Sequence, residues 1–112
     1  MENKTESNMV VGSCLRIYLS ESDKIDGEPA VETILQLCRQ CGLTGVTVLR
    51  GIEGMGSHGV HSTSFLSLSS SLPIVVEAID VKANIDTAVE RLEPHLHGKL
   101  VATWPVSLLK VM

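Results

Sequence analysis

The feature that most constrains the fold is a pair of amphipathic helix patterns, each of which follows a strand-like segment. Apolar residues recur at spacings of three and four in residues 30–41 and again in residues 85–92, with polar residues on the opposite face. Such a spacing places one apolar stripe along a helix. Both helices therefore have to bury a stripe, and the strand-like segments supply the other apolar surface.

The strand-like segments differ in how they alternate. The first segment has the two-residue period of a half-buried strand, and in the third Ile74, Val76 and Ala78 alternate with a second set of residues that includes Glu77. The second segment is apolar or Thr on both faces and predicts a central strand. The tail contains Pro105, which cannot donate to a ladder, so two separate pieces are expected there. The predicted strands are residues 14–19, 46–49, 74–79, 100–103 and 106–111.

Proline, glycine and aspartate residues mark the ends of the helices. Pro29 suits the first turn of the first helix, and Gly42 suits the left-handed position that ends it. Asp80 can cap the second helix, and Pro94 ends or kinks it. Gly98 then opens a turn before the tail.

The order β-α-β-β-α-β predicts an α+β protein with the ferredoxin-like split βαβ fold, an antiparallel sheet with both helices on one face and a short C-terminal strand extension. The 112 residues are enough for one domain, which we expect to span residues 13–112. Residues 1–12 are polar and predict a disordered leader. The free sheet face would carry Val75 and Ile79, which favours an oligomer interface.

Composition and charge exclude several classes of partner. The chain has a formal net charge of −4 and no cluster of basic residues, so nucleic acid is not an expected partner. Its first nine residues lack an apolar signal region, and no apolar run approaches the ~20 residues that span a bilayer. A cytoplasmic protein that is not embedded in a membrane is expected. The three cysteines, an odd number, favour reduced thiols over a disulfide framework.

Glycines crowd the segment after residues 46–49. Five of them fall within fifteen positions, and glycine permits positive φ or close approach to a ligand. A flexible or ligand-contacting loop is predicted over residues 54–62. The glycines are Gly45, Gly51, Gly54, Gly56 and Gly59.

Cysteine and histidine pairs offer a possible metal site. Cys38 and Cys41 form C-x-x-C, and His58 and His61 form H-x-x-H, which together could supply four tetrahedral zinc ligands. The alternative is that both cysteines are core residues, because they lie on the apolar stripe of a helix. The chain lacks a phosphate-binding P-loop motif and a recognisable Ser-His-Asp context, so it is not expected to be an enzyme.

Several motifs in residues 16–80 carry a resemblance to a known family. They read, in order, R-I-Y-L-S-E-S-D, D-G-E-P, G-L-T-G-V-T-V-L-R-G-I-E-G-M-G, H-S-T and L-P-I-V-V-E-A-I-D. The chain resembles the small PII-like proteins classed as a domain of unknown function, relatives of the nitrogen-regulatory PII signal transducers and of the CutA trimers. The resemblance implies a ferredoxin-like fold, a homotrimer and a regulatory role.

The resemblance also implies a ligand site. PII proteins hold adenine-nucleotide phosphates between subunits, at the base of the long loop after the second strand and at a turn after the second helix. The signatures around the modifiable tyrosine of PII proteins are absent here, and SLLKVM at the C-terminus offers only Lys110 as a basic residue. The implied ligand-binding residues are Arg50, Gly51, Glu53, Gly54, Gly56, His61, Gly98 and Lys99.

Two functions follow from this resemblance. The first is a homotrimer that senses a small anionic ligand, such as an adenine nucleotide, and acts on a partner protein through the loop after the second strand. The partner could be a membrane transporter, as for many PII relatives. The alternative is a divalent-metal-binding trimer of the CutA kind. Its candidate ligands are His58, His61, Cys38 and Cys41.

Overall fold

The computed structural model describes residues 8–56, 59–62 and 72–109. Its elements follow the predicted order, with two short hairpins added. They are β1 (Met9–Ser20), β2 (Lys24–Ile25), β3 (Glu28–Pro29), α2 (Ala30–Gln40), β4 (Val46–Arg50), β5 (Glu53–Gly56), β6 (Gly59–Ser62), β7 (Pro73–Val81), α3 (Lys82–Leu92), the 3-10 turn η1 (Glu93–His95) and β8 (Leu100–Leu109).

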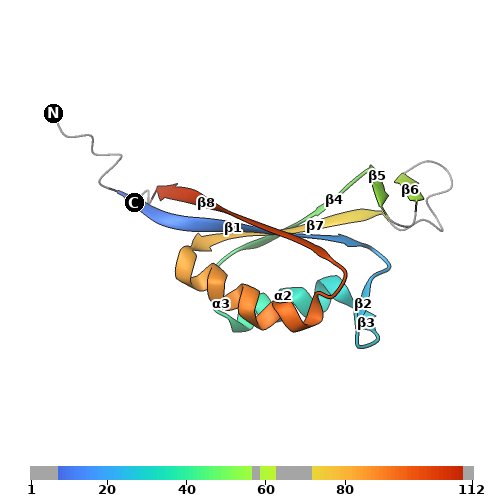
Figure 1. Ribbon diagram of the computed structural model, residues 1–112, viewed down its shortest axis with the longest axis horizontal. Helices are drawn as coiled ribbons and strands as arrows, with labels where there is room; N and C mark the ends of the chain where they lie inside the picture. The colour runs from blue at the N-terminus through green and yellow to red at the C-terminus, as the bar shows by residue number, and fades with distance from the viewer. Residues whose placement is uncertain (1–7, 57–58, 63–71, 110–112) are drawn as a thin grey trace.

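A four-stranded antiparallel sheet forms one layer and the two helices form the other. The strand order is β4-β7-β1-β8, and each neighbouring pair is antiparallel. Figure 1 shows α2 and α3 on the same face of this sheet. The predicted ferredoxin-like split βαβ fold is therefore confirmed.

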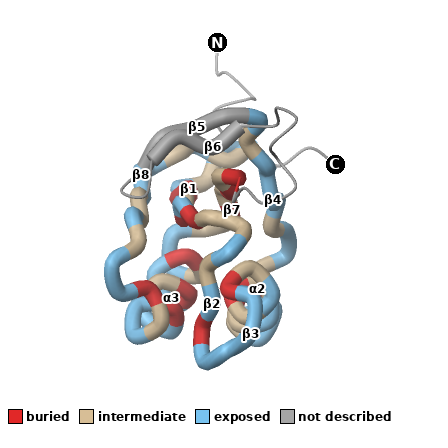
Figure 2. The backbone as a smooth tube through the Cα atoms, turned by 90° about the vertical axis from the view of Figure 1, so that its right-hand side faces the viewer, coloured by how far each residue is buried: buried red, intermediate tan, exposed pale blue. Residues whose placement is uncertain are grey.

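The core lies between the helices and the sheet. Alternate residues of β1 and β7 point toward the helices, so the two-residue period of the sequence becomes one buried face. Figure 2 shows the buried positions between the two layers. None of the described helices is long and apolar enough to cross a membrane. The largest side chains with at most 1% exposure are Leu15, Ile17, Ile34, Val76, Ile85 and Leu92.

The first strand begins earlier than the sequence predicted. Residues 1–12 were expected to form a leader, but β1 starts at Met9, which pairs with Leu109 of β8. Gly12 is tightly packed, since a Cβ there would come within 2.6 Å of the Leu108 side chain. Pairing with β8 thus orders a stretch that carries no strong strand pattern of its own, and residues 1–7 lie outside the described part.

The strand at residues 46–49 lies at an edge, not in the centre of the sheet. In the split βαβ arrangement, β7 occupies the position between β1 and β4. Val48 and Leu49 consequently remain 39% and 46% exposed. The prediction of a central strand is wrong. Apolar residues on both faces also occur on an edge strand when the single chain leaves that strand partly exposed.

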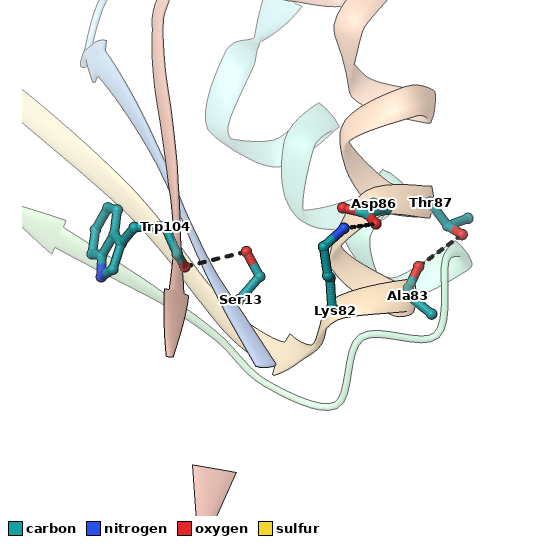
Figure 3. Close-up of polar contacts among 6 residues, drawn as sticks. All are labelled: Ser13, Lys82, Ala83, Asp86, Thr87 and Trp104. Atoms are coloured by element: carbon teal, nitrogen blue, oxygen red, sulfur yellow. Dashed lines mark hydrogen bonds and ion pairs between the residues drawn. The ribbon is translucent and has the colours of Figure 1, made fainter. Parts of the chain in front are cut away.

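The C-terminal strand is continuous, although two pieces were predicted. β8 pairs with β1 from Leu100 to Leu109 and includes Pro105 opposite Ser13. An edge strand has a neighbour on one side only, so a proline can be tolerated there. The Ser13 hydroxyl also donates to the carbonyl of Trp104, the residue before the proline, at 3.3 Å (Figure 3).

The helix ends largely follow the predicted signals. Gly42 has φ +81° after α2, and Gly98 has φ +76° before β8, so both adopt the left-handed conformation. Pro29 precedes α2 as its N-cap residue. Asp80 does not cap α3, because Val81 holds that position without a side-chain cap. The Asp80 carboxylate instead accepts hydrogen bonds from the Val81 N–H at 2.7 Å and from Asn84 at 3.0 Å.

Candidate functional site

The base of the glycine-rich segment is held by an ion pair. Arg50, the last residue of β4, places its Nη2 atom 2.5 Å from Oε1 of Glu21. The Glu21 N–H also donates a hydrogen bond to the Leu72 carbonyl at 2.9 Å. The candidate cation Arg50 is therefore paired with a carboxylate just after the end of β1.

Gly51 has a structural reason to be glycine. Its N–H donates to the Pro73 carbonyl at 2.7 Å, and a Cβ at this position would lie 2.6 Å from Cγ of the Pro73 ring. The close approach that we predicted for a ligand is here an approach to β7. The Gly51 amide already has a partner within the chain.

Lys99, the second candidate cation, has the same kind of partner. Its Nζ lies 3.0 Å from Oδ1 of Asp23, and both side chains are about three-quarters buried, with 22% and 25% exposure. The other oxygen of Asp23 accepts the Ser20 N–H at 2.8 Å. Gly98 provides the positive φ of the turn that places Lys99 immediately before β8.

The two cations lie at the same end of the sheet but at opposite edges. Arg50 pairs with Ile74 near the start of β7, and Leu100, next to Lys99, pairs with Tyr18 near the end of β1. Because β4 and β8 are the two outer strands, β7 and β1 lie between them. One chain therefore presents one candidate phosphate-binding cation along each edge.

The predicted loop over residues 54–62 contains a small two-stranded ribbon. β5 and β6 pair antiparallel, with Gly54 opposite His61 and Gly56 opposite Gly59. In Figure 1 this hairpin extends beyond the end of the main sheet, at the end away from the start of β1 and the end of β8. His58 lies outside the described residues. The main-chain pairing places Glu53, Gly54, Gly56 and His61 on the hairpin.

The cysteine half of the alternative metal site packs into the core, with Cys38 buried and Cys41 partly buried. Cys38 is completely buried, and Cys41 packs against the same cluster, as the core interpretation of the C-x-x-C predicted. Within the described ranges, no three His, Cys, Asp or Glu side chains gather where they could hold a metal ion. A site that includes His58 remains a prediction.

The thiols should differ sharply in reactivity. All three cysteines are free, and burial, with a smaller contribution from Cys41, raises the pKa of Cys38 to about 11. We expect iodoacetamide at pH 8 to modify Cys41 at least about tenfold faster than Cys38, because only the accessible thiolate reacts. Peptide mass spectrometry over time measures both rates. In denaturant the two rates should converge, and equal rates in the folded protein would contradict the burial of Cys38.

The sheet face away from the helices, here called the open face, combines apolar side chains with one ion pair. Arg16 Nε lies 2.6 Å from Oε2 of Glu77, and the Arg16 guanidinium carbon lies 5.6 Å from the centre of the Trp104 ring. Ile79, which we expected on this face, is 44% exposed. Strand pairing places further apolar residues on the same face, namely Tyr18, Leu49, Val75 and Leu100.

Sequence reasoning missed both acids that hold the candidate cations. Glu21 and Asp23 belong to the S-E-S-D segment, which we treated as a loop and as part of a family motif. Their partners are distant in sequence, so spacing alone gives no pairing. The available signal was that two acids at alternate positions directly follow a strand end, where neighbouring strands can supply basic partners.

Comparison with known proteins agrees with this architecture. The model of the family DUF190 (Uncharacterized ACR, COG1993) matches residues 12–108. The UPF0166 protein MJ1524 of Methanocaldococcus jannaschii is 36% identical over 84 residues, covering 75% of this chain and 78% of that protein. A UPF0166 protein of Aquifex aeolicus is 35% identical over 85 residues, covering 75% and 81%.

Among solved structures, the chain is similar to CPII, a nitrogen regulatory PII-like protein from Thiomonas intermedia K12. That structure contains ADP, AMP and bicarbonate. The TM-score is 0.67 with 19% sequence identity, and the match covers 91% of this chain and 92% of CPII. At this identity the similarity establishes a shared PII-like fold.

Proposed function

This chain belongs to the DUF190 family, and on that premise we propose that it is a regulatory homotrimer that senses a small anionic ligand, an adenine nucleotide, in the cleft between subunits. It is a binding protein and not an enzyme. The ligand contacts would come from Arg50 and Lys99, with the turn and hairpin positions supplying main-chain N–H donors. Those positions are Gly98, Glu53, Gly54, Gly56 and His61.

The observation that carries this proposal is the placement of the two cations. Arg50 ends β4 and Lys99 precedes β8, so the cations lie at one end of the sheet but along opposite edges. A phosphate chain is short, and it could contact both cations only if two copies brought a β4 edge next to a β8 edge. Arginine and lysine both form charge-assisted hydrogen bonds to phosphate oxygens.

The open face supports the trimer. It carries a row of apolar side chains on all four strands, and a small protein gains stability by covering such a surface with a sister copy. Around a three-fold axis, each copy would contribute one edge to each of two clefts. CPII, which shares the fold, was solved with ADP and AMP, and this favours adenine nucleotides as the first ligands to test.

We propose that the β5–β6 hairpin is the part of the protein that contacts a partner and responds to the ligand. It extends beyond the sheet next to Arg50, so a ligand at Arg50 would lie beside its base (Figure 1). A ligand that contacts one hairpin conformation more favourably than another would shift the population and change the surface shown to a partner. We propose that this partner is another protein, such as a membrane transporter.

Removal of Lys99 tests the site directly. We expect Lys99→Ala to weaken ADP binding by about tenfold or more, since a hydrogen bond to a charged group contributes ~1.5–3 kcal/mol. Isothermal titration calorimetry on the full chain measures the dissociation constant. Lys82→Ala is the matched control, because Lys82 also pairs with an aspartate, Asp86 at 2.6 Å, but lies at the start of α3 (Figure 3).

The control should bind ADP as the wild type does. Absence of ADP binding by the wild type would show that the proposed ligand is wrong. Equal losses in the Lys99 and Lys82 variants would show that charge in general, and not the cleft, determines binding.

A further inference from the structure

We infer that Glu21 is an internal competitor of the ligand: its carboxylate occupies Arg50 in the free protein, and a phosphate group must displace it to bind. This inference rests on the proposed function and adds the residue that opposes binding. It also identifies the contact through which ligand binding would affect Leu72, the residue before β7.

The first support is the geometry of the Glu21 carboxylate, whose two oxygens have different partners. Oε1 lies 2.5 Å from Nη2 of Arg50, and Oε2 accepts the Leu72 N–H at 3.4 Å. The Glu21 N–H in turn donates to the Leu72 carbonyl at 2.9 Å. Glu21, which directly follows β1, therefore contacts both the last residue of β4 and the residue that precedes β7.

The second support is charge. A carboxylate and a phosphate are both anionic acceptors, and each binds the guanidinium group through the same N–H donors. Two anions side by side repel one another, so the site favours one occupant at a time. The Arg50 side chain is 64% exposed and so is open to an incoming anion, whereas Glu21 is 29% exposed.

The third support is that the same segment repeats the arrangement at the other cation. Asp23, two residues after Glu21, pairs with Lys99 at 3.0 Å. Both candidate phosphate-binding cations of the chain are thus neutralised by carboxylates from one short stretch. The two acids are not equivalent, because Asp23 also accepts the Ser20 N–H at 2.8 Å and so supports the local turn. Glu21 is therefore the better residue to test.

Displacement of Glu21 would have a local consequence. If the displaced side chain turns away from Arg50, the Leu72 N–H also loses Oε2 of Glu21, the acceptor that now lies 3.4 Å away. The residues next to this pair are also linked, because the Gly51 N–H donates to the Pro73 carbonyl. A change at Arg50 can therefore affect both the end of β4 and the start of β7. An anion at Arg50 is in this way coupled to the conformation at the start of β7.

The experiment compares ADP binding by the wild type, Glu21→Gln, Arg50→Ala and the double variant, using calorimetry on the full chain. Gln keeps the shape of Glu and a carbonyl acceptor for Leu72 but removes the negative charge. Exposed ion pairs contribute up to ~1 kcal/mol, so we expect Glu21→Gln to bind ADP about three- to fivefold more tightly. Asp26→Asn is the control, because Asp26 is an exposed acid at the β2–β3 turn and its φ of 51° suits Asn.

The gain must disappear when Arg50 is absent, so Glu21→Gln in the Arg50→Ala background should bind no better than Arg50→Ala alone. Amide hydrogen exchange at Leu72 should also become faster when ADP binds the wild type. If the wild type binds ADP and Glu21→Gln binds equally or more weakly, the inference is wrong while the proposed function stands. If none of the proteins binds ADP, both fail.

Discussion

Replacement of Ile17 by alanine should lower the free energy of unfolding by about 3 kcal/mol, within the ~2–5 kcal/mol typical of Ile-to-Ala changes in a core. Ile17 is completely buried in β1, one of the two inner strands, and belongs to the cluster between sheet and helices. The smaller side chain buries less apolar surface and leaves a cavity in the core cluster. Because small domains have ~5–15 kcal/mol of stability in total, this is a large fraction.

Urea unfolding followed by circular dichroism measures this effect. The midpoint should fall while the slope stays the same, as expected when stability changes but the unfolding reaction does not. Val11→Ala is the control, because Val11 lies on the same strand but is 70% exposed, and it should change stability by less than about 0.5 kcal/mol. All proteins must be compared at one concentration, since assembly would add to stability. Equal losses at both positions would contradict the described core.

The helices and the core could be predicted because their signals are local. The apolar stripe of residues 30–41 becomes a helix that buries Ala30, Ile34 and Cys38, and the later stripe buries Ile85, Ala88 and Leu92. In both cases a spacing of three or four residues is enough to determine which side faces inward. The alternation in β1 and β7 works in the same way for the sheet.

The position of each strand in the sheet could not be predicted from its own residues. β4 has apolar residues on both faces and was expected in the centre, yet it is an edge strand. Pro105 was expected to end a strand, yet β8 continues through it because that strand has only one neighbour. Both outcomes depend on which strands are adjacent, and adjacency is set by the whole topology.

The candidate site was only half visible in the sequence. The family resemblance identified Arg50 and Lys99, but their partners Glu21 and Asp23 lie 29 and 76 residues away in the chain. An acid in a loop is usually solvated, so composition gives no reason to single out these two. Gly51 shows the converse case. The sequence predicted that a glycine there allows close approach to a ligand, whereas in the structure it allows close approach to Pro73.

Replacement of Ile79 by glutamate should convert the proposed trimer into monomers. Ile79 lies on the open face opposite Cys14, and its 44% exposure means that a single chain could carry a glutamate there at little cost. In a trimer that buries this face, the new carboxylate would lose its hydration without a partner. Such a buried, unpaired charge costs at least several kcal/mol per subunit, enough to prevent assembly.

Light scattering at micromolar concentration measures this effect as a threefold fall in molar mass, with the circular dichroism of the folded chain retained. Gln36→Glu adds the same charge on the exposed side of α2 and should leave the mass unchanged. A wild type that is already monomeric would show that the open face is not covered by sister copies. An Ile79→Glu protein that keeps the wild-type mass would place the subunit contact elsewhere, and burial of the open face would then not bring Arg50 of one copy next to Lys99 of another.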